Sequence, residues 1–200
     1  QKQLEPVIFP IGDLQKTQLR QIAHEAGLTT WQKKDSTGIC FIGERRFREF
    51  LSTFLPAHSG DILDLNGKKI GTHTGAMYYT LGQRHGLGIG GSNSGNGEPW
   101  FVVKKDIQNN IVYAAQGEHP MLYSKNSKAS KLSFIYGSAP SNSFDCTAKF
   151  RYRQPDQRVH VEICGSEMLI THEQPQRAVT PGQSVVLYDG EVCLGGGIID

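Results

Sequence analysis

The sequence predicts an α+β protein that is mostly β, with a short helical segment, a small central β domain and a C-terminal antiparallel β-barrel. Apolar residues at helical spacing are found before Pro56. After that point, short apolar runs alternate with turn residues, a pattern typical of antiparallel strands. The last part repeats this pattern without intervening helices, which favours a small barrel. We therefore expect three domains, over residues 1–56, 57–122 and 123–200.

Two helices are predicted in the first domain. The first begins after Asp13, whose carboxylate can accept hydrogen bonds from free backbone N–H groups, and it ends before Gly27. Its apolar residues share one face: Leu19, Ile22, Ala23 and Ala26. The second runs from about residue 44 to residue 55, and its apolar residues also recur at helical spacing: Phe47, Phe50, Leu51 and Phe54. The opposite face carries arginines, and we interpret it as solvated.

Turn dipeptides between apolar runs predict four β-hairpins. They are Asn66-Gly67, Asn109-Asn110, Gly165-Ser166 and Asp189-Gly190. The polar stretch 123–129 is predicted to be the linker into the last domain. The glycine-rich stretch 82–97 contains a G-x-G-x-x-G match, but serine and asparagine follow it instead of a helix. A dinucleotide site is therefore not expected there, and we predict a mobile loop.

Charge and cysteine usage narrow the classes of function. Lys and Arg number 21 and Asp and Glu 19, so the net charge is +2, and any RNA-binding surface must come from local clustering. The four cysteines lie far apart without a C-x-x-C pair, which fits neither a zinc site nor a dense disulfide scaffold. The histidines lack H-x-x-H spacing, so no metal is predicted. A reducing cytoplasm is the simplest compartment, and no apolar run approaches membrane-spanning length.

Cys40 is the candidate nucleophile. It lies in the stretch 35–47, D-S-T-G-I-C-F-I-G-E-R-R-F, just before a predicted helix, with lysines upstream and arginines downstream. A helix N-terminus and nearby cations both favour the thiolate, which is the reactive form. The apolar neighbours of Cys40 fit a small buried hydrophobic residue equally well. The residues alone leave both interpretations open.

The stretch 35–47 closely resembles the signature of the bacterial tRNA-specific 2-thiouridylase family, whose members replace O2 of the wobble uridine with sulfur. Further blocks match in the order of the family: 77–84 (M-Y-Y-T-L-G-Q-R) with 86–91, 151–154 (R-Y-R-Q), 178–183 (A-V-T-P-G-Q) and 190–197 (G-E-V-C-L-G-G-G). The resemblance implies a C-terminal barrel like that of translation elongation factors. It also implies that residues 1–56 end an ATP-pyrophosphatase domain, whose phosphate loop and second catalytic cysteine are not visible in this sequence.

The resemblance assigns a role to Cys40. In the family this cysteine carries a persulfide, which a sulfur-carrier protein delivers. ATP activates the uridine by adenylation, and the base flips out of its stack. The terminal sulfur then attacks C2, either directly or after release as hydrosulfide, and the second cysteine forms a disulfide with Cys40. We expect a cytoplasmic sulfurtransferase whose ATP is bound by the domain not visible here. The chain alone is expected to bind no ATP and to be inactive.

A second candidate site lies in the last domain. Three cations alternate with apolar residues in a predicted strand: Lys149, Arg151 and Arg153. A row of cations at this spacing can meet successive RNA phosphates, although the residues alone favour an edge strand protected by charge. The resemblance places Arg151, Tyr152 and Gln183 at tRNA contacts and favours the RNA interpretation.

Two other functions are weighed against the thiouridylase. A non-catalytic RNA-binding module would bind tRNA irrespective of Cys40, and a thiol redox enzyme would use Cys40 without RNA. The order of the matching blocks favours the thiouridylase over both. Cys146 and Cys164 fall in alternating strand patterns and are predicted to be packed, and Cys193 is predicted to be structural.

Overall fold

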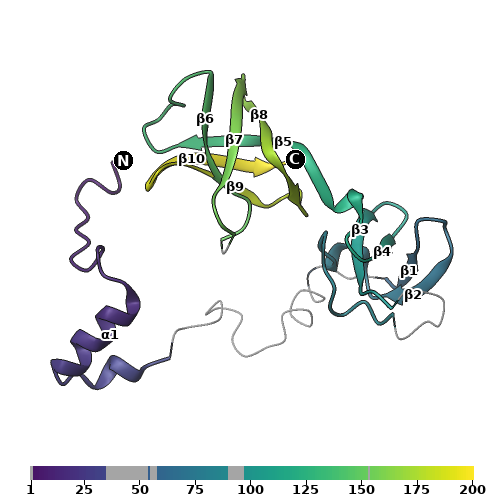
Figure 1. Cartoon of the computed structure of the whole chain (residues 1–200), viewed down its shortest axis with the longest axis horizontal. Helices are drawn as coiled ribbons and strands as arrows, with labels where there is room; N and C mark the ends of the chain where they lie inside the picture. The colour runs from purple at the N-terminus through teal and green to yellow at the C-terminus, as the bar shows by residue number, and fades with distance from the viewer. Residues whose placement is uncertain (1, 35–53, 55–57, 90–96, 153) are drawn as a thin grey trace. The chain divides into compact units, whose positions relative to one another are not determined.

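The computed structural model describes residues 2–34, 54, 58–89, 97–152 and 154–200. Chain contacts divide the protein into two compact units, Gln1–Phe54 and Leu55–Asp200. Figure 1 shows helix α1 (Lys16–Glu25) in the first unit and two groups of strands in the second. The predicted class, mostly β with a C-terminal antiparallel barrel, is confirmed. The division into three domains stays a prediction.

The first unit contains α1 and a short 3-10 helix, η1 (Thr29–Gln32). The N-cap of α1 is Gln15, whose backbone N–H donates to the side-chain oxygen of Gln18 at 2.9 Å. Asp13 was therefore the wrong cap, because the preceding turn continues past it and the helix begins two residues later than expected. Gly27 ends the helix as predicted, with a φ of +67° that other residues rarely adopt. The second predicted helix lies outside the described residues, apart from Phe54.

The second unit begins with a four-stranded sheet in the order β2-β1-β4-β3, in which only β1 and β4 pair in parallel. The strands are β1 (Gly60–Leu63), β2 (Lys69–His73), β3 (Trp100–Asp106) and β4 (Ile111–Gln116). Both predicted hairpins of this region are confirmed. Gly67 and Asn110 have φ values of +82° and +52°, the left-handed conformation that glycine and asparagine tolerate in tight turns.

Apolar residues of the sheet form its core. Ile62, Val102 and Val112 are fully buried, and Tyr79 and Leu87 from the connection between β2 and β3 pack with them. The segment 76–89 is therefore fixed to the sheet by its apolar side chains. Burial of this area supplies most of the favourable free energy of folding.

The barrel closes in the order β10-β5-β8-β7-β6-β9, with every pair antiparallel. Its strands are β5 (Tyr123–Phe134), β6 (Ser143–Lys149), β7 (Gln157–Cys164), β8 (Glu167–Arg177), β9 (Ser184–Asp189) and β10 (Val192–Ile199). Both predicted hairpins of this region are confirmed. Full closure removes exposed strand edges.

The polar stretch 123–129 is part of β5, so its prediction as a linker was wrong. It pairs with β8, and its residues alternate between an outer face and the barrel interior, where Ala129 is fully buried. Strand pairing supplies the backbone hydrogen bonds, and this long-range interaction overrides the low β propensity of serine, lysine and asparagine.

The glycine run near the C-terminus is explained by the close approach of β10 to both of its neighbours, β5 at Gly195 and Gly197 and β9 at Gly196. A Cβ atom added at Gly196 would lie 1.9 Å from the carbonyl oxygen of Val185, so a side chain cannot fit there. No helix in the described ranges has the length and apolar character needed to cross a membrane.

Candidate functional site

Cys40 lies outside the described residues, so the structure gives no geometry for the candidate nucleophile. The other three cysteines are described, and none of them forms a disulfide. Burial, with the nearby carboxylates of Asp145 and Asp189, raises the pKa of the half-buried Cys146 thiol to about 11. At neutral pH this thiol stays protonated, which makes it a poor nucleophile. Cys164 is exposed at the end of β7, so its prediction as a packed residue was wrong.

The predicted row of cations on one strand is wrong. Strand β6 ends at Lys149, and beyond it the backbone N–H of Gln154 donates to the Arg151 carbonyl oxygen at 3.0 Å, a hydrogen bond that closes a turn. Tyr152, expected on the inner face, is 93% exposed. Pro155 follows the turn and cannot donate the backbone hydrogen bond of a strand, so the alternation stops here.

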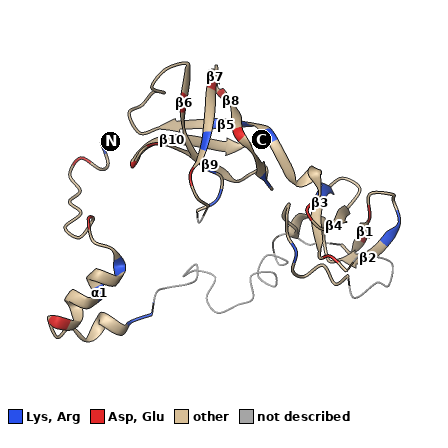
Figure 2. Ribbon diagram, in the orientation of Figure 1, with Lys and Arg blue, Asp and Glu red and all other residues tan. Residues whose placement is uncertain are grey.

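Lys149 and Arg151 therefore have different surroundings. The ammonium group of Lys149 lies 3.2 Å from an Asp156 carboxylate oxygen and 5.5 Å from the centre of the Tyr188 ring. Arg153 lies outside the described residues. In Figure 2, the basic and acidic residues are interspersed over the barrel strands.

The structure brings the other predicted tRNA-contacting residues to one end of the barrel. Lys149 at the end of β6 pairs with Val186 near the start of β9, so the two flanking turns lie side by side. The turn after β6 carries Arg151 and Tyr152, and the turn before β9 carries Gln183. All three residues are exposed at this end.

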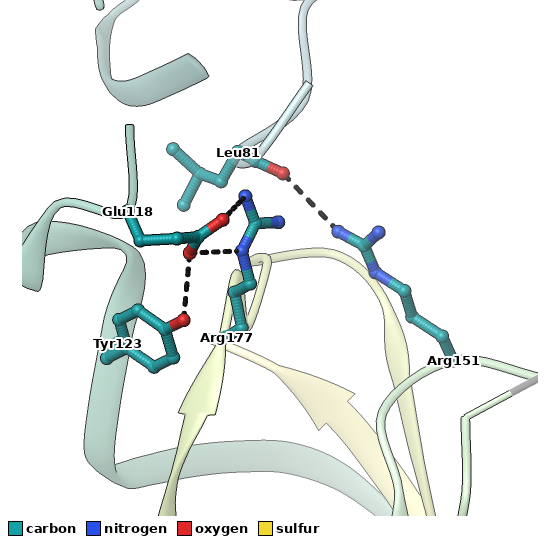
Figure 3. Close-up of polar contacts among 5 residues, drawn as sticks. All are labelled: Leu81, Glu118, Tyr123, Arg151 and Arg177. Atoms are coloured by element: carbon teal, nitrogen blue, oxygen red, sulfur yellow. Dashed lines mark hydrogen bonds and ion pairs between the residues drawn. The ribbon is translucent and has the colours of Figure 1, made fainter. Parts of the chain in front are cut away.

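Arg151 also contacts the central sheet region. Its Nη2 atom lies 3.3 Å from the Leu81 carbonyl oxygen (Figure 3). The same atom lies 3.4 Å from the Ala178 carbonyl oxygen at the end of the barrel strand β8. Both distances are long for hydrogen bonds, so they orient the guanidinium group without holding it tightly. Arginine carries five N–H donors, and these contacts are compatible with a further contact to a phosphate.

A cluster that the sequence did not reveal lies beside Arg151. Arg177, at the end of β8, donates from Nε and Nη2 to the two carboxylate oxygens of Glu118 at 2.9 and 3.1 Å. The hydroxyl of Tyr123 donates to the same carboxylate at 2.8 Å, as Figure 3 shows. Glu118 and Arg177 are 59 residues apart, and no local pattern in the sequence indicates their pairing.

The electrostatics of this cluster favour the ion pair. The hydrogen bond from Arg177 lowers the pKa of the Glu118 carboxyl, and the bond to Glu118 raises the pKa of the Tyr123 hydroxyl. Glu118 also raises the pKa of Arg177. At neutral pH the cluster therefore contains a carboxylate, a guanidinium and a neutral phenol, a combination of charge-assisted bonds. Among the residues that the structure describes, no group of three or more His, Cys, Asp or Glu side chains could hold a metal ion.

Three family models match successive parts of the chain. A tRNA methyl transferase HUP domain matches residues 1–44, and a tRNA methyl transferase PRC-barrel domain matches residues 48–116. An aminomethyltransferase beta-barrel domain matches residues 124–199, which cover the closed barrel.

Three similar curated proteins share one name. The tRNA-specific 2-thiouridylase MnmA of Francisella philomiragia is 57% identical over 201 residues, which are 100% of this chain and 56% of that protein. The proteins of the same name from the novicida and tularensis subspecies of Francisella tularensis are each 56% identical over the same share. The chain thus spans little more than half the length of the curated relatives that it matches. With three domain matches in succession and this identity along its whole length, the chain belongs to the tRNA-specific 2-thiouridylase family.

Proposed function

We propose that the chain supplies the sulfur-carrying cysteine and part of the tRNA-binding surface of a tRNA 2-thiouridylase. The observation that carries this proposal is the identity of 57% over the whole chain with a protein of that name. The G-I-C-F cysteine and the exposed turns at one barrel end support it. The match of residues 1–44 to a HUP domain fits the use of ATP.

In the proposed reaction, Cys40 carries a persulfide delivered by a sulfur-carrier protein. ATP bound elsewhere in the complete protein adenylates O2 of the wobble uridine and releases pyrophosphate. The terminal sulfur attacks C2, AMP leaves, and the uridine is linked to Cys40 through a disulfide bond. A second cysteine then attacks the Cys40 sulfur, which releases 2-thiouridine and leaves a disulfide on the enzyme. Reduction of that disulfide must follow, which suits a cytoplasmic location.

The exposed barrel turns are proposed to bind the tRNA. Arg151 has donors for a phosphate, the Tyr152 ring can stack on a base or sugar, and the Gln183 amide can bond to either. Lys149 and Arg153 are retained as weaker candidates, and the Asp156 partner of Lys149 lowers its availability. These contacts would hold the tRNA in register while the target base flips into the active site.

The test is the replacement of Cys40 in the complete protein. Cys40→Ser should abolish 2-thiouridine formation and leave tRNA affinity within about twofold, because a neutral side chain of similar size makes no phosphate contact. Cys164→Ser, which changes an exposed thiol, is the matched control and should retain activity. The nucleosides are measured by mass spectrometry after digestion of the tRNA.

Three other results would each favour a different function. Added methyl mass in place of a sulfur-for-oxygen exchange would favour the methyl transfer named by two of the family models. Tight tRNA binding without any modification would favour a non-catalytic RNA-binding module. Peroxide reactivity of Cys40 without a need for tRNA would favour a thiol redox enzyme.

A further inference from the structure

A set of contacts that we name the clamp holds the central sheet region against the barrel. The clamp consists of Gly82, Glu118, Tyr123, Arg177 and Ala178. Glu118 follows β4 of the sheet, whereas Arg177 ends β8 of the barrel and Ala178 follows it. The clamp therefore joins two parts of the chain that have separate hydrophobic cores.

The backbones approach each other closely in the clamp. A Cβ atom added at Gly82 would lie 2.7 Å from Cβ of Ala178, so only glycine fits. The N–H of Gly82 donates to the Val102 carbonyl oxygen of β3 at 2.8 Å, and that of Ala178 donates to the Leu122 carbonyl oxygen at 2.6 Å. Each side of the contact is thus fixed by backbone hydrogen bonds, and a change on one side reaches the other.

The guanidinium group of Arg177 contacts two protein groups. It bonds to both carboxylate oxygens of Glu118, and it lies 4.8 Å from the centre of the Phe101 ring of β3. This two-point pairing with a carboxylate, together with stacking on an aromatic ring, is the geometry in which arginine fixes orientation. Arg177 is therefore committed to protein contacts, in contrast to the loosely held Arg151.

The clamp fixes a loop that carries two exposed polar residues. In the 80–85 loop, the Gln83 side chain accepts from the Thr80 N–H at 3.0 Å and donates to the His85 carbonyl oxygen at 2.8 Å. Arg84 and His85 are exposed. The Leu81 carbonyl oxygen of this loop is one of the two that Arg151 contacts, so the loop lies beside Arg151.

We propose that Arg177 and Glu118 are positioning residues that hold the 80–85 loop beside Arg151 and Tyr152, so that the loop and these two residues present one continuous surface to tRNA. Arg84 and His85 then extend the surface of Arg151 and Tyr152 across the junction. This inference rests on the proposed function for the identity of the ligand. Contacts from two elements bind a polyanion well only if their spacing is fixed in advance, because ordering them on binding costs affinity.

A positioning role and simple electrostatics predict opposite changes in tRNA affinity when Glu118 is replaced. Glu118→Gln in the complete protein removes a negative charge, which by itself strengthens binding to a polyanion. A positioning role instead predicts tRNA binding that is about three- to tenfold weaker, because the loop must be ordered during binding. Arg177→Ala should weaken binding to a similar extent, and the double variant should be no weaker than Arg177→Ala alone.

Glu167→Gln is the matched control. Glu167 is also exposed and paired, with Lys128 at 2.7 Å, but it lies at the opposite end of the barrel from Arg151. The tRNA affinity of Glu167→Gln should stay the same or rise. Gly82→Ala, which introduces the clash with Ala178, should weaken binding as Glu118→Gln does. Gly67 has a similar φ of +82°, but an added Cβ there would have no atom within 4 Å. Gly67→Ala should therefore leave tRNA binding unchanged.

Amide hydrogen exchange without tRNA separates the clamp from the proposed function. The Gly82 and Ala178 amides should exchange faster in Glu118→Gln than in the wild type. If exchange is faster in Glu118→Gln but the wild type binds no tRNA, the clamp is supported and the proposed function is wrong. Faster exchange with unchanged tRNA affinity would overturn the positioning role. Unchanged exchange with equal or tighter tRNA binding would overturn the clamp itself.

Discussion

At the scale of single residues, His172 has the most unusual environment in the barrel. Its side chain is fully buried, its Nε2 lies 2.9 Å from the Ser127 hydroxyl, and its ring meets Phe150 edge to face at 4.9 Å. Its Nδ1 has no hydrogen-bond partner within the described parts of the chain. Burial, and to a smaller extent Lys125, lowers the pKa of His172 to about 4. The folded protein therefore holds this imidazole neutral.

This pKa predicts a loss of stability in mild acid. The unfolded chain takes up a proton at His172 below about pH 6.5, whereas the folded protein does so only near pH 4, so the free energy of unfolding falls between these values. The fall should reach roughly 2–3 kcal/mol by pH 4.5. Urea unfolding of the wild type and His172→Gln at pH 7 and pH 4.5 measures it. An equal fall in both proteins would show that other groups cause it.

At the scale of elements, the end of β6 decides which cations face solvent. Lys149 remains in the strand and pairs with Asp156, whereas Arg151 lies in the turn and is exposed. The end of the strand thus distinguishes two cations, Lys149 and Arg151, that looked equivalent in the sequence. A phosphate contact releases counterions from RNA, so its loss changes the salt dependence of binding.

Replacement of Arg151 tests this distinction. Arg151→Ala should weaken binding of all substrate tRNAs about equally and flatten the slope of log affinity against log salt by roughly one unit or slightly less. It should raise KM more than it lowers kcat, because a phosphate contact is similar in the ground and transition states. Lys149→Ala, the comparison variant, should change the slope less. If Arg151→Ala leaves slope and affinity unchanged, Arg151 serves only the Leu81 and Ala178 carbonyl groups.

At the scale of the whole molecule, all three hydrophobic clusters of the described residues lie in the unit Leu55–Asp200. Helix α1 contains no buried residue, and Ile8 and Phe9 before it are 83% and 68% exposed. The free energy of folding of the second unit should therefore come from its own cores.

Removal of residues 1–54 tests this independence. The remaining chain should unfold in one cooperative transition, with a Tm within about 4 °C of the corresponding transition of the 200-residue chain, since a change of about 1 kcal/mol shifts a domain of this size by that much. Calorimetry of both proteins provides the comparison. A larger fall in Tm, or loss of the cooperative transition, would show that the second unit depends on the first.

The sequence by itself determined the four hairpins, the closed antiparallel class of the last domain and the family to which the chain belongs. Turn dipeptides such as Asp189-Gly190 act locally, because the left-handed backbone they require excludes most other residues. The alternation of side chains is equally local, because it follows from the geometry of a single strand.

Only the tertiary structure decided that residues 123–129 form a strand, that β6 stops at Lys149 and that Glu118 pairs with Arg177. Each of these features depends on partners distant in the sequence. The strand over residues 123–129 needs β8 to satisfy its backbone hydrogen bonds. The Glu118–Arg177 pair joins residues from the two sides of the clamp. Local propensity carries no information about such partners, because pairing energy exists only after the chain has folded and brought them together.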